Sequence, residues 1–240
     1  MLFELLQSLP PTIPVMVVDN SPAPLLLPVT TAFPGVSYHH AGSNQGYGKG
    51  HNLALSLSPP SEFHLIVNPD IVITPGAIQK MLLFMDQHPD IGLLVPKVLN
   101  QDGTTQYLNR HYPTALDLLL RHLPACLMTE NLQQRVQRHE MQDQGYDSVC
   151  EPECVSGAFM LCRRSVLEQI NGFDPRYFLY FEDFDLGLSV RAVGMRTVFY
   201  PDVSVVHRWA RASSSDKRLL MIHLESMVKF FNKWGWRWKG

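Results

Sequence analysis

The chain has 240 residues, a length that fits one large α/β domain or two small ones. Twenty basic and 22 acidic side chains leave a formal net charge of −2, and 45% of the residues are hydrophobic. This composition excludes a disordered chain, supports a sizeable core and lacks the basic character of a nucleic-acid-binding domain. We therefore expect no nucleic-acid partner.

Cysteine usage and hydropathy indicate a cytoplasmic protein. The four cysteines are too few for a disulfide scaffold, and no Cys/His pair at zinc spacing follows Cys150 and Cys154. We expect ordinary reduced thiols. No apolar run approaches the ~20 residues that span a bilayer, and the first residues lack the basic flank of a signal peptide.

Short apolar runs alternate with helical patterns along the first hundred residues. Strands are predicted over residues 15–18, 36–39, 63–67 and 91–95, and helices over 51–57 and 75–87. This alternation predicts a mostly parallel sheet covered by helices on both faces.

The second half of the chain contains a weakly patterned stretch and then a regular one. Residues 101–147 are predicted to be a helical insertion with helices over 116–122 and 130–142. The elements expected after it are a strand over 159–162, helices over 165–170 and 183–193, strands over 196–200 and 203–206, and an amphipathic helix over 219–234. We predict a single domain over residues 1–240, with residues 216–240 as its C-terminal helical segment.

Two acidic residues directly follow buried strands. Asp19 comes after residues 15–18, and Asp70 after residues 63–67. Ligands of open α/β sheets bind beyond the carboxyl ends of strands, where such side chains bind ribose hydroxyls or a divalent cation. The alternative for either residue alone is the capping of a turn.

The segment from Asn44 to Gly50 carries three glycines at alternate positions before a helix. Its backbone N–H groups are suited to a phosphate. It matches neither the P-loop nor the dinucleotide-binding fingerprint, and taken alone it is better explained as a tight turn.

Three carboxylates, Glu182, Asp183 and Asp185, lie among aromatic residues. Apolar surroundings disfavour the ionised form of a carboxyl group, which suits proton abstraction near neutral pH. Helix capping is the structural alternative for Asp183. His207 ends an apolar strand, where it is either structural or part of a metal site with a carboxylate.

The order of these motifs resembles a known family. The segments that carry the resemblance are Val17-Val18-Asp19-Asn20-Ser21, Asn44-x-Gly46-x-Gly48-x-Gly50-x-Asn52, Asn68-Pro69-Asp70, Ser156-Gly157-Ala158-Phe159, Gly172-Phe173-Asp174, Phe181-Glu182-Asp183-Phe184-Asp185-Leu186 and Pro201-Asp202 with His207. Together they resemble family 2 inverting glycosyltransferases of the GT-A fold, nearest the rhamnosyltransferase-like branch. The resemblance implies an α/β, Rossmann-like nucleotide-sugar fold with a central sheet.

The resemblance also implies a role for each matching residue. Asp183, in the Glu182–Asp183 pair, corresponds to the general base, and Asp70 with His207 to the site of Mg²⁺ or Mn²⁺. The residues that correspond to the donor site are Asp19, Asn44, Gly46, Asn68, Gly157 and Ala158. The implied reaction moves a sugar, with L-rhamnose as the first expectation, from a nucleotide-diphosphate donor to a glycan or lipid-linked acceptor. Cell-surface polysaccharide synthesis at the inner membrane face is the expected setting.

One departure from the family pattern affects the sheet. Family members begin with a central strand of the form V-V-I-V-T-Y-N, whereas residues 1–9 resemble the end of the first helix. We therefore expect an N-terminally truncated domain whose sheet has a gap or unpaired edges. A non-catalytic glycan- or partner-binding module is the main alternative function. A nucleotidyltransferase would open with a G-x-G-T-R-like loop, which is absent.

The C-terminal segment, residues 229–239, combines three tryptophans with four cations. Such a mixture favours peripheral contact with an anionic membrane. The alternative is that Phe230, Phe231 and Trp234 pack the terminal helix onto the domain, and the two interpretations are compatible.

Overall fold

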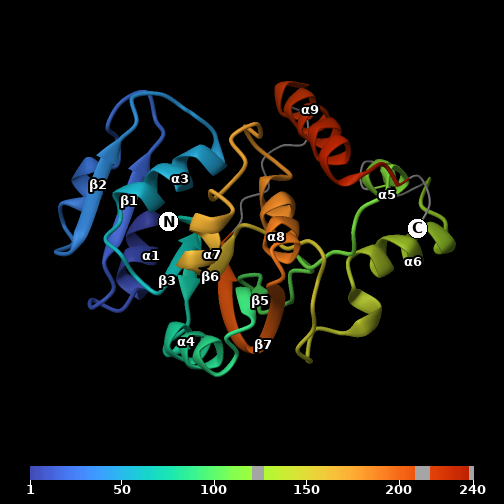
Figure 1. The fold of residues 1–240 in the computed structure, drawn as a ribbon, viewed down its shortest axis with the longest axis horizontal. Helices are drawn as coiled ribbons and strands as arrows, with labels where there is room; N and C mark the ends of the chain where they lie inside the picture. The colour runs from blue at the N-terminus through green and yellow to red at the C-terminus, as the bar shows by residue number, and fades with distance from the viewer. Residues whose placement is uncertain (121–126, 209–216, 238–240) are drawn as a thin grey trace.

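The computed structural model describes residues 1–120, 127–208 and 217–237. Helices flank central β-structure (Figure 1), as the predicted α/β class requires. In chain order the elements are α1 (Leu2–Ser8), β1 (Val15–Asp19), α2 (Leu27–Thr30), β2 (Val36–His40), α3 (Tyr47–Leu57), β3 (Phe63–Val67), β4 (Ile71–Ile73), α4 (Ala77–Gln87), β5 (Ile91–Leu99), α5 (Ala115–Leu120), α6 (Glu130–His139), the 3₁₀ turn η2 (Gln142–Gln144), β6 (Phe159–Arg163), α7 (Arg164–Gln169), α8 (Glu182–Ala192), β7 (Arg196–His207) and α9 (Lys217–Trp234).

The strands form two sheets, a parallel pair and a five-stranded sheet of mixed direction. β1 pairs with β2 in parallel, and a five-stranded sheet has the order β3-β6-β5-β7-β4. Within it, β5 and β7 are parallel, whereas β6 runs antiparallel to β3 and β5, and β4 antiparallel to β7. The prediction of a mostly parallel sheet is therefore wrong. An apolar run reports the burial of a strand and carries no information about its direction.

The last strand is continuous where the sequence predicts two. β7 covers both predicted strands, and its pairing with β5 jumps from Pro96–Tyr200 to Lys97–Ser204. The extra residues of β7 form a bulge that contains Pro201, which has no N–H to donate to a ladder. Proline here marks an irregularity within one strand.

A cavity separates the two sheets. Among the described residues, β1 and β3 each pair with a neighbour on one side, and no ladder joins them. The cavity has a volume of about 240 Å³ and is lined by residues 15–18 of β1, by leucines of α1 and by Val67, Asn68 and Pro69. The interruption of the sheet that the sequence predicts is present at this position.

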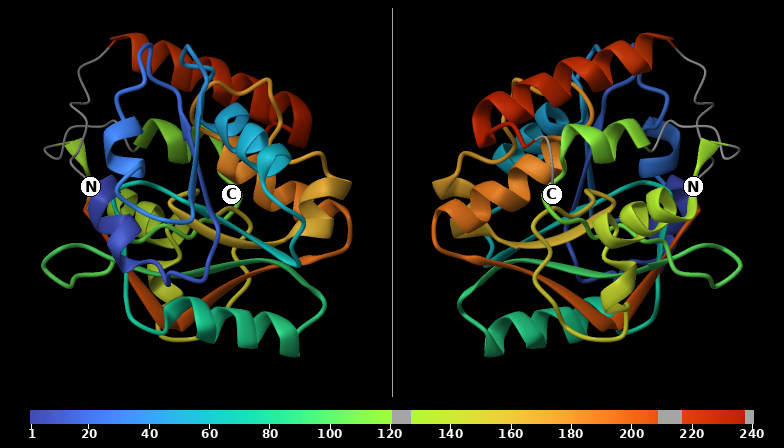
Figure 2. Two further views of the ribbon diagram at one scale, coloured as in Figure 1. Left: turned by 90° about the vertical axis from the view of Figure 1, so that its left-hand side faces the viewer. Right: turned by 90° about the vertical axis from the view of Figure 1, so that its right-hand side faces the viewer.

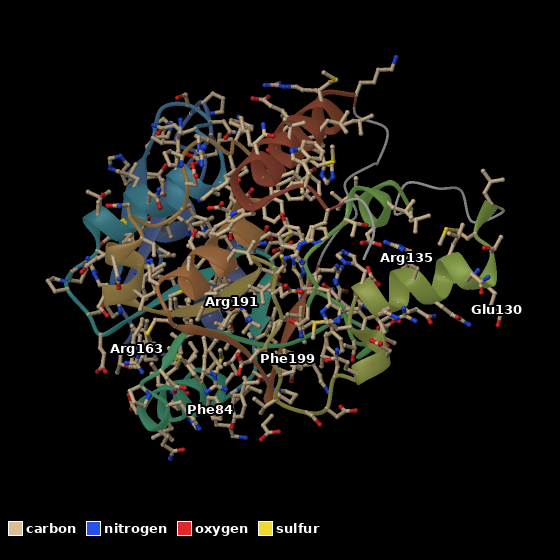
Figure 3. All side chains as sticks on the ribbon, turned by 45° about the vertical axis from the view of Figure 1, so that its right-hand side comes forward. Phe84, Glu130, Arg135, Arg163, Arg191 and Phe199 are labelled. Carbon is tan, nitrogen blue, oxygen red and sulfur yellow. The ribbon has the colours of Figure 1, made fainter. Side chains whose placement is uncertain are left out.

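Two short helices extend the domain on one side. Arg135 of α6 lies towards α5 (Figure 3), and its Nε donates a hydrogen bond of 2.6 Å to Asp117 of that helix. Both helices begin within a residue of their predicted starts, and α6 ends three residues before its predicted end. The rest of the predicted first helix, and Cys126, lie outside the described residues.

The terminal helix α9 lies across the outside of the molecule, next to α8 (Figures 1 and 2). Phe230 and Phe231 are fully buried beside Tyr177 and Phe181. Lys233 Nζ lies 2.7 Å from the buried Asp185 carboxylate, to which Trp234 Nε1 also donates a hydrogen bond of 2.7 Å. Phe230, Phe231 and Trp234 therefore pack α9 onto the domain. No helix in the described part of the chain is long and apolar enough to span a membrane.

The glycine-rich segment enters α3 earlier than predicted, because Tyr47 already begins the helix. Gly46 directly precedes it with φ of 93°, and a Cβ atom on Gly46 would lie 2.3 Å from the Phe178 carbonyl oxygen. Tyr47 N–H donates a hydrogen bond of 3.0 Å to the same oxygen. Glycine is needed here both for its backbone conformation and for the close approach of residues 46 and 178.

We predict that Gly46→Ala lowers the free energy of unfolding by at least about 2–3 kcal/mol, because left-handed backbone strain adds to a backbone clash. Gly42→Ala is a matched control, since Gly42 has φ of 75° and open space around its Cβ position. It should cost only about 1–2 kcal/mol. Urea unfolding of both variants measures the difference. Equal decreases in the free energy of unfolding would show that the close contact with Phe178 does not contribute to the effect.

Candidate active site

The site is built around the turn that precedes β6. β3 and β6 are antiparallel with Val67 opposite Phe159, so the residues after β3 lie beside the residues before β6. Asn68 N–H donates a hydrogen bond of 3.0 Å to the Ala158 carbonyl oxygen. The Asn68-Pro69-Asp70 segment and the Gly157–Ala158 turn, separated by about ninety residues in sequence, therefore form one edge of the sheet.

The same turn holds Asp183, in the first turn of α8. Gly157 N–H donates a hydrogen bond of 3.0 Å to Asp183 Oδ2, and Phe184 N–H donates to Asp183 Oδ1 at 2.9 Å. A Cβ atom on residue 157 would lie only 3.1 Å from the Tyr47 hydroxyl and 3.4 Å from Asp183 Cβ. Glycine at this position allows the two side chains to approach the backbone.

Backbone strain lies directly before these carboxylates. Tyr180 and Phe181 have φ of 70° and 66°, values that are uncommon for bulky residues and cost of order 1–3 kcal/mol each. Phe181 is the N-cap residue of α8, so the strained turn sets where the helix begins and hence where Glu182 and Asp183 point. Such strain persists only where the surrounding structure enforces it.

Burial controls the ionisation of the pair. Glu182 is 4% exposed, and its burial, together with the charge of Asp183, raises the pKa of its carboxyl group to about 8. Burial also raises the pKa of Asp183, although the backbone N–H groups of Gly157 and Phe184 oppose the shift by stabilising the carboxylate. The expectation that apolar surroundings disfavour ionisation here agrees with these directions.

Asp70 and His207 meet across the β4–β7 ladder. Ile71 pairs with His207, and Arg208 N–H donates to the Asp70 carbonyl oxygen at 2.9 Å. His207 Nε2 lies 3.3 Å from Asp70 Oδ2, while its Nδ1 lies 3.0 Å from Gln106 Oε1. Gln106 thereby orients the imidazole so that Nε2 faces the carboxylate.

Several oxygens at this edge are buried and have no hydrogen-bond partner among the described residues. They are Asn68 Oδ1, Asp70 Oδ1 and Glu182 Oε2. A buried polar atom left unpaired costs about 1–3 kcal/mol. Such atoms are informative in a native fold, and these three belong to residues that the sequence selects for donor binding, metal binding and catalysis.

Tyr47 is a site residue that sequence reasoning did not identify. Its hydroxyl donates a hydrogen bond of 2.6 Å to the Gly157 carbonyl oxygen. Burial raises the pKa of Tyr47, and the charges of Asp183, Glu182 and Asp70 raise it further, so the phenol stays a proton donor. An aromatic residue inside a glycine-rich run was the available signal. Gln106 gave none, since it lies in a weakly patterned stretch.

The remaining predicted donor residues lie towards β1. Asn20 Nδ2 donates to the Gly46 carbonyl oxygen at 3.0 Å, which connects the end of β1 to the glycine-rich segment. Asn44 Oδ1 accepts the Gly46 N–H at 2.9 Å. Asp19 is 1% exposed and accepts hydrogen bonds from Ser21 N–H, Leu26 N–H and the Tyr38 hydroxyl. These contacts outweigh its burial and lower its pKa to about 2, so Asp19 shapes the loop after β1, and its contact with a nucleotide stays a prediction.

Comparison with known proteins identifies the family. The family described as "Glycosyltransferase like family 2" matches residues 5–220, and the chain belongs to it. The N-acetylglucosaminyl-diphospho-decaprenol L-rhamnosyltransferase of Mycobacterium tuberculosis is 28% identical over 194 residues, which cover 77% of this chain and 62% of that enzyme. The rhamnosyltransferase WbbL of Escherichia coli K12 is 24% identical over 200 residues, 80% of this chain and 72% of WbbL. The chain thus spans less than two thirds of the mycobacterial relative.

Solved structures share the fold. GalNAc-T7, crystallised with UDP, GalNAc and Mn²⁺, superposes with a TM-score of 0.65 at 11% identity, over 95% of this chain and 44% of that one. Residues 1–349 of Staphylococcus aureus TarS with UDP-GlcNAc give 0.60 at 18% identity, over 96% of this chain and 63% of that one. At this level of identity the similarity shows the GT-A type of fold alone.

The raised pKa of Glu182 predicts how stability depends on pH. The folded state binds the proton more tightly than the unfolded chain, so this contribution to stability is complete at low pH. It is lost as pH rises from about 4.5, the ordinary value, through about 8. At pH 9 we expect the free energy of unfolding of Glu182→Gln to exceed that of the native chain by at least about 1 kcal/mol. Urea unfolding measures this difference. At pH 4 the difference should nearly vanish.

The control is Glu168→Gln on α7, whose carboxylate is exposed and paired with Arg164 at its surface. It should show no stabilisation at pH 9. A Glu182→Gln variant that is equally destabilised at both pH values would contradict the assignment of a raised pKa.

Proposed function

We propose that this chain transfers a sugar from a nucleotide-diphosphate donor to a hydroxyl of a glycan or lipid-linked acceptor, with inversion at the anomeric carbon. The observation that carries the proposal is the hydrogen-bonded series from Asp183 through Gly157 and Ala158 to Asn68, with Asp70 and His207 beside it. It joins a candidate base to a candidate cation site at one edge of the sheet.

Asp183 is the candidate base. Its carboxylate is held by Gly157 N–H and raised in pKa by burial, so it is basic enough to take a proton from an acceptor hydroxyl. Burial and the charge of Asp183 raise the pKa of the neighbouring Glu182 as well, so the pair disfavours ionisation of both carboxyl groups at once. A base on one side of the sugar and the leaving diphosphate on the other suit a single in-line displacement.

The residues beside Asp70 fit a divalent cation, Mg²⁺ or Mn²⁺. Asp70 Oδ1 and Asn68 Oδ1 are buried oxygens without partners, and oxygen is the ligand that hard cations prefer. Gln106 leaves His207 Nε2 facing Asp70, the orientation that a ligating histidine needs. The described residues contain no cluster of three His, Cys, Asp or Glu side chains, so the donor diphosphate would have to supply further ligands. A bound cation would neutralise charge that develops on the leaving diphosphate.

The names of the relatives support the choice of substrates. Two of them are rhamnosyltransferases, and one name specifies an acceptor that is a sugar linked to decaprenyl diphosphate. We therefore propose L-rhamnose, carried by dTDP, as the first donor to test, with UDP-sugars next. The corresponding acceptor is a lipid-linked sugar or a growing polysaccharide. The chain would reach it as a peripheral protein at the inner face of the membrane.

One observation favours a second candidate function. The cavity between β1 and β3 borders Asn20 and Asn68, so the side of the site expected to hold the nucleotide lacks a continuous sheet. A chain that binds a glycan or a partner protein without turnover would tolerate this gap. Product formation from dTDP-rhamnose or UDP-sugars and a lipid-linked acceptor decides between the two functions.

We expect Asp183→Asn to reduce turnover by about 10²–10⁴-fold, since general-base catalysis is typically worth that much. Binding of the sugar nucleotide should change little, because it does not require an ionisable oxygen at this position. Asp86→Asn, an exposed change of the same charge on α4, is the control. Single-turnover transfer measures the effect, and more than a third of native turnover in Asp183→Asn would remove Asp183 from the role of base.

We expect Asp70→Ala to abolish the increase in nucleoside diphosphate affinity that Mn²⁺ produces, because the variant lacks the carboxylate that would hold the cation. Calorimetric titration of dTDP and UDP, with and without Mn²⁺, measures this without any turnover. Asp86→Ala serves as the control. An unchanged response to Mn²⁺ in Asp70→Ala would place the cation elsewhere.

A further inference from the structure

The terminal helix α9 has one face that is fixed to the domain. Phe230 and Phe231 are fully buried, and the Ser226 hydroxyl donates a hydrogen bond of 2.8 Å to the Leu179 carbonyl oxygen. Lys233 forms ion pairs with Asp174 and Asp185. This face cannot turn outward without the loss of these contacts, so the orientation of α9 is set.

The opposite face of α9 exposes large apolar side chains in a row. Leu220, Met221, Leu224 and Val228 are 46%, 66%, 40% and 42% exposed. Residues 221, 224 and 228 follow helical spacing along one side, and Leu220 lies next to them. We call these four residues the α9 stripe. Single exposed apolar residues are ordinary on a protein surface, whereas a contiguous row marks a contact surface.

The charges around the α9 stripe are mainly positive. Lys217 and Arg218 are exposed in the first turn, which contains no acidic residue. Cations at a helix N-terminus are opposed by the helix dipole, by about 0.3–1 kcal/mol each. Glu225 is the single acid of the helix sequence, and it pairs with Lys229 at 2.7 Å.

We propose that the α9 stripe docks on the surface of an anionic lipid bilayer. An amphipathic helix with apolar residues on one side and cations at its border lies in the headgroup region, with its apolar face against the acyl chains. Each cation near an anionic surface adds to the attraction. A second copy of α9 is a poorer occupant, because the one acid of the helix, Glu225, is already paired with Lys229 and offers Lys217 no free carboxylate.

Docking through the α9 stripe would bring the candidate active site to the bilayer. Phe230 of α9 packs against Phe181, the residue that precedes Glu182, at 5.2 Å between ring centroids, and Lys233 binds Asp185 on α8. The helix that docks is thus fixed to the helix that carries Asp183. This consequence rests on the proposed function: an acceptor linked to a membrane lipid would be presented to Asp183 by a surface-bound enzyme.

The test is co-sedimentation of the whole chain with vesicles of phosphatidylcholine alone or mixed with phosphatidylglycerol, at low and at high salt. We expect binding to the anionic vesicles that weakens with salt. Replacement of the whole α9 stripe by serine should lower the partition coefficient at least about tenfold. Lys217→Glu should weaken binding at low salt only. Leu83→Ser, which removes an equally exposed leucine (60%) from α4 on the far side of the molecule, is the matched control (Figure 2).

Circular dichroism and the thermal midpoint establish that the serine variant is folded. The proposal is overturned if the native chain does not bind anionic vesicles or the folded serine variant pellets as the native chain does. It is also overturned if analytical ultracentrifugation shows a dimer that the serine variant loses, since the stripe would then join two copies. Asp183→Asn should pellet like the native chain, so failure of the proposed reaction and failure of membrane docking are separable.

Discussion

The hydrogen bond from the Gly157 peptide N–H to Asp183 is the contact on which the rest of the site depends. The same glycine accepts the Tyr47 hydroxyl at its carbonyl oxygen, and the next residue accepts Asn68 N–H. One turn thus connects the glycine-rich segment, the end of β3 and the start of α8. A side chain at residue 157 would press on Tyr47 and Asp183, so the connection requires glycine.

Several features of the site oppose folding. Two aromatic residues with left-handed backbone conformation precede α8, and Glu182, Asn68 and Asp70 each have a buried side-chain oxygen without a hydrogen-bond partner among the described residues. Each feature destabilises the fold by an amount of order 1–3 kcal/mol. Phe181 packs with Tyr177, Phe230 and Phe231 in one buried cluster, which holds the strained turn in place.

The arrangement of α8 and α9 connects this chemistry to the surface of the molecule. Asp185 is on the same helix as Asp183 and is nearly fully buried, yet it carries no proposed catalytic role. Its carboxylate binds Lys233 and Trp234 of α9, with the Tyr177 hydroxyl at 3.3 Å. A motif acid that sequence reasoning groups with the base thus fixes the terminal helix to α8.

The sequence by itself determined the α/β class and the positions of most strands and helices, because periodic burial is a local property of the chain. The order of its motifs selected Asp70, Gly157, Asp183 and His207 as candidate site residues, and their roles stay predictions. The sequence did not determine strand direction, the continuity of β7 through Pro201, or the division into two sheets, because pairing partners are chosen by contacts distant in sequence. Tyr47 and Gln106 entered the site only through the tertiary structure, as their roles lie in hydrogen bonds to residues about a hundred positions away. Likewise, the pattern of α9 showed that it is amphipathic, but only its packing revealed which of its two apolar faces is covered and which one faces outward.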